Sequence, residues 1–307
     1  MLFRTLSGLL VCFGLYLWIL GGEHTAESGE AAFLTGSMES RYVITAGSAT
    51  LLTASPEDVH GRMEPAGRRA SSGPPDIHTL QNINERFTYE VRYGFLRLGD
   101  VHVYLKGDTL YQDTPAVHMV TEMVSNRRLP LIGYREVHYH SFLAYNDSIP
   151  YGLRFWQNSL HRDKFERYLY EFDYASGNVY SFEEGEAVDT LDLSRPGDGG
   201  PAVMYYSRMF AGTAGDRTYP IYIDHEQSEI EMSFTDRQES YDSPAFPDED
   251  IKAYIMNGNA DFEGPFGFSG EFTAFYKDDD LRIPLEARVS IWLGSVRVRL
   301  TEYERLQ

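Results

Sequence analysis

The sequence predicts a mainly β protein, built as a strongly curved antiparallel sheet or partly open barrel with one packed helix. Apolar side chains fall at every second residue from Leu285 to Leu293 and again from Val296 to Leu300, with Gly294 between the two runs. A period of two places one row of side chains in a core and the other in water, as in antiparallel strands with one solvated face. The aromatic content of 14%, with 22 Tyr and 18 Phe, also favours strands.

The same alternation begins at Phe87 and indicates a strand as far as Tyr93, followed by a turn and a second strand over 101–105. Lys106-Gly107-Asp108 predicts another turn, and Ser176-Gly177-Asn178 predicts a hairpin connection. The other expected strands cover 116–124, 134–145, 151–157, 164–174, 178–183, 219–224, 229–236, 252–257, 270–277, 285–293 and 295–303.

One segment breaks the pattern of alternation. Residues 201–212, PAVMYYSRMFAG, place Val203, Tyr206 and Phe210 at helical spacing, between a proline at the start and Gly212 at the end. A single helix in a β protein usually fills the concave side of a curved sheet or covers an edge. We therefore expect this helix to pack on the sheet.

The N-terminal residues 1–22 read as a signal peptide or as an N-terminal anchor. Thr5 to Gly22 is a run of 18 uncharged residues that follows Arg4. The cleavage site is a poor match to the usual pattern, and the run is almost long enough to span a bilayer, so both fates remain open. Either fate predicts an exported protein, periplasmic or associated with the cell envelope.

Residues 23–84 differ from the C-terminal part of the chain, because they are rich in small and polar residues and show no sustained period. So little apolar surface does not offset the entropy of ordering a chain. We expect a disordered or loosely ordered linker here, followed by a single β domain over residues 85–307. The chain contains one cysteine, Cys12, and hence no intrachain disulfide.

The formal net charge of −19 limits the partners of the protein. An acidic folded region repels phosphate backbones and anionic lipid surfaces, so we expect no nucleic-acid binding and membrane contact only through an uncleaved N-terminal segment. The sequence contains no phosphate-binding loop, no dinucleotide fingerprint and no zinc-protease motif. No cofactor is expected, and a non-catalytic protein is favoured over an enzyme.

An aromatic row is the candidate ligand site. Tyr168, Tyr170, Phe172 and Tyr174 alternate along one predicted strand and therefore share one face of it. Facing an open concavity, such rings would bind an acyl chain or a glycan. The alternative is that the row packs against the helix or a second layer as ordinary core.

Two groups of polar residues are considered as candidate metal sites. Glu136, His138 and His140 share a strand face, and imidazoles with a carboxylate are zinc or iron ligands. No fourth ligand is identifiable, so a solvated polar face is the competing interpretation. Asp278-Asp279-Asp280 lacks the alternating ligands of a calcium loop and instead predicts a polar turn before Pro284.

Two stretches carry a family resemblance: ERFTYEVRYGFLRLGDVHVYL at residues 85–105 and GFSGEFTAFYKDDDLRIPLEARVSIWLGSVRVRLTEY at residues 267–303. With the helix at 201–212, they resemble a bacterial family known as the domain of unknown function 3108, over residues 85–305. The resemblance implies an exported protein of a kind frequent in Gram-negative bacteria, with no established activity. It also implies a fold similar to the curved sheets of periplasmic lipoprotein carriers, a fold-level analogy alone.

These observations lead to three functional hypotheses. The first is an envelope protein that binds an apolar or amphipathic ligand, such as a lipid, or an envelope protein partner, through the row at residues 168–174. The second is a structural or assembly scaffold that docks on another protein. The third is a hydrolase with a dispersed site, which requires a cleft with a hydrogen-bonded nucleophile and base.

Overall fold

The computed structural model describes residues 73–128, 134–146, 149–161, 164–223, 225–260, 262, 270–291 and 294–306. Within these residues the chain forms two helices, α2 (Ile77–Gln81) and α3 (Ala202–Arg208). The strands of the described residues are β1 (Asn84–Tyr93), β2 (Leu96–Tyr111), β3 (Thr114–Ser125), β4 (Arg135–Tyr145), β5 (Pro150–His161), β6 (Lys164–Asp173), β7 (Asn178–Glu183), β8 (Glu186–Asp192), β9 (Gly215–Ile223), β10 (Glu226–Tyr241), β11 (Ile251–Ala260), β12 (Gly270–Lys277), β13 (Pro284–Ile291) and β14 (Gly294–Leu306).

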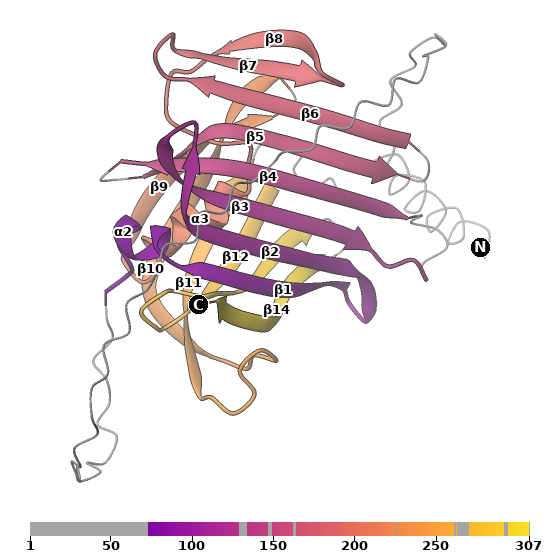
Figure 1. Ribbon diagram of the computed structural model, residues 1–307. Helices are drawn as coiled ribbons and strands as arrows, with labels where there is room; N and C mark the ends of the chain where they lie inside the picture. Colours follow the sequence, from indigo (N-terminus) through magenta and orange to yellow (C-terminus); the bar gives the residue numbers. More distant parts are fainter. Residues whose placement is uncertain are drawn as a thin grey trace, which may run out of the picture. The chain divides into compact units, whose positions relative to one another are not determined.

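The strands of the described residues form one antiparallel sheet of fourteen, in the order β8-β7-β6-β5-β4-β3-β2-β1-β14-β13-β12-β11-β10-β9. Strands that are consecutive in the chain pair with each other, except β8 and β9, and the pairing of β1 with β14 joins the two halves. The sheet does not close, because β8 and β9 are its two ends. Figure 1 shows β1 to β8 in front of β9 to β14, with α3 between the two halves. The predicted fold class, a curved antiparallel sheet with a packed helix, is confirmed.

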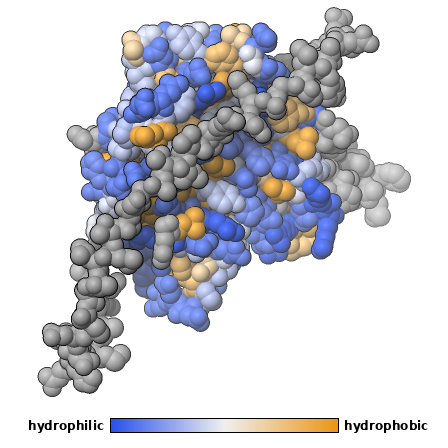
Figure 2. Space-filling view, in the orientation of Figure 1, coloured by the Kyte–Doolittle hydropathy of each residue, from blue (hydrophilic) through white to orange (hydrophobic). Residues whose placement is uncertain are grey.

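The main core lies on the inner face of the curved sheet, around α3. Alternate residues of β1, such as Phe87 and Val91, point into it, as do Val296 and Leu300 of β14. These are the apolar rows that the sequence places at every second position, and burial of such side chains is the main favourable term in folding. The visible face in Figure 2 is largely hydrophilic where it is not grey, with apolar side chains in separate patches.

A smaller core forms where β9 packs across the inner face of β4 to β7. Tyr222 of β9 is fully buried there, edge-on to Phe172 of β6 at 5.4 Å between ring centroids. The connection from β8 to α3 holds this arrangement, because the carbonyl of Gly197 accepts from Gly152 of β5 and the carbonyl of Asp198 accepts from Tyr222. This connection ties β5 to the free edge of β9, so the open sheet is held curled by backbone hydrogen bonds.

The folded region begins earlier than residue 85. Most of the predicted linker, residues 23–72, lies outside the described residues, as does the N-terminal segment 1–22. Residues 73–84, however, contain α2, and β1 starts at Asn84. Asp76 accepts a hydrogen bond from the backbone N–H of Thr79 and so caps α2, which buries Ile77 and Leu80 in the main core. A five-residue helix is too short for its period to stand out in the sequence.

The position of one turn and the presence of one strand also differ from the prediction. The expected turn at Lys106-Gly107-Asp108 is a bulge inside β2, where the pairing with β3 shifts register and Asp108 has a φ of 49°. The real turn lies at Gln112 and Asp113. The sequence does not predict the edge strand β8, because all but one of its residues are exposed and no apolar row marks it.

Neither helix of the described residues has the length and apolar character that a membrane crossing requires.

Candidate functional site

The structure divides the predicted aromatic row between core and surface. Tyr170 and Phe172 of β6 are buried in the small core against Tyr222. Tyr168 packs at the margin of this cluster, and Tyr174 is partly exposed and donates a hydrogen bond to the carbonyl of Gly152. None of these four side chains lines the apolar pocket that lies between α3 and the inner face of the sheet. Burial assigns the two central rings to the core, so the ligand site that we propose lies elsewhere.

Glu136, His138 and His140 lie on the outer face of β4, and Val137 and Tyr139 between them are buried, as the alternation predicts. His138 contacts Glu136 at 2.7 Å, whereas the His140 ring stacks on Trp156 at 4.5 Å. Burial, with the nearby His118 and His138, lowers the pKa of His140 to about 4, so this ring is neutral at neutral pH.

His140 thus belongs to a row of stacked rings on the outer face, whereas His138 contacts the carboxylates of Glu122 and Glu136. Among the residues that the structure describes, no group of three or more His, Cys, Asp or Glu side chains is arranged to hold a metal ion. The aspartates at 278–280 form the predicted polar turn, in which Asp279 accepts hydrogen bonds from the backbone of Leu281 and Ile283.

A hydrogen-bonded serine, histidine and carboxylate occur at the β9–β10 connection. The Nδ1 atom of His225 lies 3.0 Å from the hydroxyl of Ser181, and its Nε2 lies 3.0 Å from Glu183. These are residue types of a hydrolytic triad. However, Ser181 is only 1% exposed in the middle of β7, and its hydroxyl also contacts the carbonyl of Asp189. A substrate carbonyl has no access to a hydroxyl buried in this way, so the three side chains tie the β9–β10 connection to β7.

A pocket of about 300 Å³ lies between α3 and the inner face of the sheet. Val203 and Met204 of α3 form one side, and Met119, Thr121 and Met123 of β3 form the opposite side. Strands β12 to β14 complete the wall with side chains that include Phe272, Ala274 and Val298. Because methionine is unbranched and adaptable, such a wall fits apolar molecules of more than one shape.

A larger depression of about 600 Å³ lies on the outer face of β9 to β12. Its lining includes Asp216, Glu231 and Glu271 together with several amide and hydroxyl side chains. Three carboxylates beside amide and hydroxyl groups keep this open surface hydrated, whereas the lining of the pocket beside α3 is mainly apolar, as in most ligand sites. The pocket beside α3 is therefore the better candidate site.

Buried charges hold α3 in place beside the pocket. Both side-chain oxygens of Glu85 accept hydrogen bonds from Arg208, at 2.6 and 3.0 Å, and Tyr303 donates to the same carboxylate. Arg208 and Glu85 are 0% and 1% exposed. Near the other end of α3, Asp198 accepts hydrogen bonds from the backbone of Ala202 and from Ser141. The helix is thus joined to β1 and to β4 by polar contacts.

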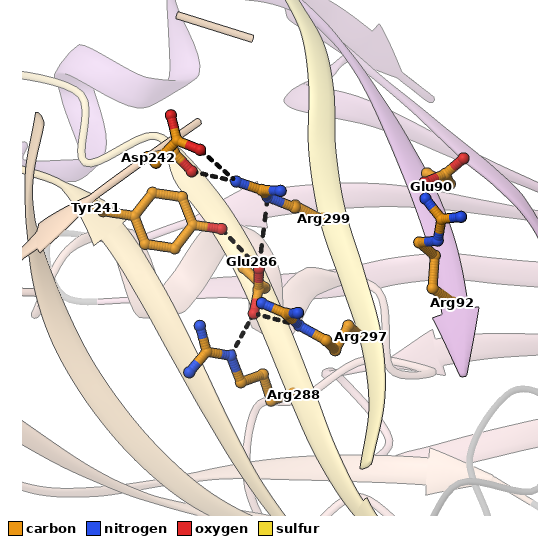
Figure 3. A network of polar contacts seen from close by, with 8 residues as sticks. All are labelled: Glu90, Arg92, Tyr241, Asp242, Glu286, Arg288, Arg297 and Arg299. Atoms are coloured by element: carbon orange, nitrogen blue, oxygen red, sulfur yellow. Dashed lines mark hydrogen bonds and ion pairs between the residues drawn. The ribbon is translucent and has the colours of Figure 1, made fainter. Parts of the chain in front are cut away.

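A second polar network lies on the outer face of β13 and β14. Figure 3 shows Tyr241, Arg288, Arg297 and Arg299 pointing toward the carboxylate of Glu286. Burial raises the pKa of Glu286, but hydrogen bonds from Tyr241 and Arg288 and the charges of the arginines outweigh burial and lower the pKa overall. Arginine side chains therefore cover a carboxylate that faces outward from the sheet.

A family model matches most of this chain. The model of the family described as "Protein of unknown function (DUF3108)" matches residues 88–301. The chain belongs to the DUF3108 family. The resemblance seen in the sequence is thereby confirmed, and the matched region runs from β1 to β14, including α3.

Beyond the family match, no curated protein matches this DUF3108 chain. Among solved structures, it is similar to the "Beta-barrel-like Protein of Domain of Unknown Function DUF1849 from Brucella abortus". The TM-score is 0.48 at 11% sequence identity, over 74% of this chain and 99% of that chain. The description of neither family states an activity.

The pocket of this DUF3108 domain contains one buried hydroxyl without a partner. Thr121 is 4% exposed, and its side chain lies on the inward row of β3 between Met119 and Met123. Its Oγ1 makes no hydrogen bond to any residue that the structure describes. A buried hydroxyl that is not hydrogen-bonded is costly. Sequence reasoning missed it, because one threonine in an alternating strand carries no signal of its own.

Replacing Thr121 by valine is expected to raise the free energy of unfolding by about 1 kcal/mol, because the change removes an unpaired hydroxyl and keeps the side-chain shape. Chemical denaturation measures this effect. Thr301→Val is the matched control, since the Thr301 hydroxyl donates to the carbonyl of Thr88 and its loss should destabilise by about 1 kcal/mol. Equal destabilisation by both changes would contradict the assignment.

Proposed function

We propose that this DUF3108 protein is an exported envelope protein that binds an apolar or amphipathic ligand in the pocket between α3 and β3. The observation that supports this proposal is the pocket itself, whose lining is mainly apolar and includes Met119, Met123, Met204 and Met256, with a few polar residues such as Thr121 and Ser207. Its volume of about 300 Å³ is at the lower end of the range for ligand sites, about 300 to 1,000 Å³. A single acyl chain or another slender apolar group fits these limits.

The unpaired hydroxyl of Thr121 narrows the ligand class further. A hydroxyl in an apolar wall stabilises a ligand that supplies a hydrogen-bond acceptor or donor at that depth. An ester or carboxyl group attached to an acyl chain has this combination of properties. We therefore favour an acylated molecule over a pure hydrocarbon.

Export supports the proposal from the sequence side. Residues 1–22 have the layout of a signal peptide or anchor, and an envelope location places the domain where acylated molecules are abundant. A non-catalytic role fits the burial of Ser181, because the hydrogen-bonded nucleophile and base that a hydrolase needs are present without access to substrate.

Filling the pocket should abolish binding. Ala287 lines the pocket on β13, and Ala287→Phe adds a ring to that space. We expect this change to weaken binding of a fluorescent fatty acid at least tenfold, because the added ring and an acyl chain cannot share about 300 Å³. A fluorescence titration measures the dissociation constant.

The matched control is Ala187→Phe on the exposed edge strand β8, which should leave the dissociation constant unchanged. Circular dichroism of both variants checks that the sheet is retained. A folded Ala287→Phe protein that binds the fatty acid as tightly as the parent would refute the pocket as the site. Failure of the parent to bind any acyl probe would leave the scaffold hypothesis, for which the exposed β8 edge offers a docking strand.

A further inference from the structure

Several strand connections lie at one end of the sheet, and we call the part of this end around the β1–β2 turn the hairpin edge. Tyr93 at the end of β1 pairs with Val296 near the start of β14, and Gly99 near the start of β2 pairs with Ser125 at the end of β3. The described residues that flank the β1–β2, β3–β4 and β13–β14 connections therefore lie side by side. The described residues of the hairpin edge are 92–97, 126–128, 288–291 and 294–297.

Apolar side chains protrude from this edge into solvent. Gly94, with a φ of 56°, forms the β1–β2 turn and leaves Phe95 87% exposed at its tip. The neighbouring Leu96 is 39% exposed. Single exposed apolar residues are common on protein surfaces. Phe95 and Leu96, at the tip of the β1–β2 turn, therefore indicate a binding surface only together with the charges around them.

Arginines surround the tip. Arg92, Arg297 and Arg288 lie opposite one another on β1, β14 and β13. Like charges placed directly opposite in a sheet destabilise it unless something balances them. Figure 3 shows Arg288 and Arg297 sharing the single carboxylate of Glu286, while Arg92 pairs with Glu90.

The β3–β4 connection adds two more cations beside the tip. Asn126 donates to the carbonyls of Leu98 and Arg97, at 2.7 and 2.9 Å, and this holds the following residues against the start of β2. Those residues are Arg127 and Arg128. A chain with a net charge of −19 thus collects arginines around an exposed phenylalanine at one edge.

We propose that the hairpin edge docks on an anionic lipid bilayer. Phe95 and Leu96 enter the headgroup region, and the arginines contact lipid phosphates, the combination by which peripheral proteins bind such surfaces. This contact is additional to the predicted N-terminal segment, and it is independent of the proposed ligand. It is compatible with that ligand, because the pocket extends from α3 toward the hairpin edge as far as Met123, two residues before the end of β3.

The opposite end of the sheet supplies a matched control. Leu110 at the end of β2 is 65% exposed, so it resembles Phe95 in exposure. Its neighbours include Asp108 in the bulge of β2 and Asp113 in the β2–β3 turn, and an anionic surface repels both. A membrane that selects the hairpin edge should therefore leave Leu110 in water.

The test uses the full chain with a polarity-sensitive fluorophore at one position. Cys12→Ser removes the single native cysteine, and Phe95→Cys or Leu110→Cys then receives a nitrobenzoxadiazole label. With vesicles of equal parts phosphatidylglycerol and phosphatidylcholine, emission from position 95 should shift to the blue and rise severalfold. Emission from position 110 should not change. Because the two labels share one N-terminal segment, the comparison holds whether that segment is cleaved or retained.

The charges are tested in the chain labelled at position 95. Arg127→Gln with Arg128→Gln should lower the blue-shifted fraction at a fixed lipid concentration severalfold, as should high salt or pure phosphatidylcholine vesicles. Arg237→Gln with Lys252→Gln removes the same charge from exposed sites on β10 and β11 and should have no such effect. The proposal is overturned if position 95 stays in water with anionic vesicles or if both labels respond equally.

Discussion

Replacing Arg208 by methionine is expected to lower the free energy of unfolding by about 3 to 5 kcal/mol. The change removes both hydrogen bonds to Glu85 and leaves a carboxylate that is 1% exposed without its cation. An uncompensated buried charge costs far more than the lost contact alone, because water does not reach it. Equilibrium unfolding in urea measures the loss, which should also release α3 and weaken ligand binding.

A double variant separates charge from packing. Arg208→Met with Glu85→Leu removes both charges, and replacing a buried ion pair by apolar side chains is often close to neutral. The double variant should therefore recover at least half of the stability lost by Arg208→Met. It should not recover all of it, because Leu281 and Tyr303 lose their hydrogen-bond partners. A single variant that loses less than about 1 kcal/mol would show that the pair does not hold α3.

Stability should depend on pH through Asp198, the buried carboxylate before α3. Burial raises its pKa from the ordinary 3.8 to about 6, although hydrogen bonds from the backbone of Gly199 and Ala202 and from Ser141 limit the rise. A raised pKa means that the folded chain binds the proton more tightly than the unfolded chain. The contribution to stability is therefore fully present below about pH 4 and is lost as the pH rises through 6.

The expected size of this effect is about 2 kcal/mol between pH 4 and pH 7. Asp198→Asn removes the titrating proton, so its free energy of unfolding relative to the parent should improve by that amount across the interval. Urea unfolding at several pH values gives the difference directly. Ser141→Ala is the second arm, since loss of its hydrogen bond should raise the pKa of Asp198 further and steepen the dependence. A constant difference between the parent and Asp198→Asn would contradict the assignment.

The candidate site was only partly predictable from the sequence. The inward rows that line the pocket, such as Met119 to Met123 on β3, follow from the period of two, and the helix at 201–212 follows from its own spacing. The contact between β3 and α3 does not follow from the sequence, because the five strands β4 to β8 lie between them along the chain. The two elements approach each other only when the sheet curls. The aromatic row at 168–174 illustrates the same limit, since its period shows one shared face but not that β9 covers that face.

The sequence by itself determined most of the strands, their alternating faces and the helix α3, because these depend on residues close together in the chain and on local periodicity. The motifs at residues 85–105 and 267–303 carried the family resemblance. Tertiary structure alone decided which inward faces became solid core and which bordered a pocket, and it paired Glu85 with Arg208 across 123 positions. Such long-range contacts depend on sheet curvature and strand order, which a pattern of period two does not encode.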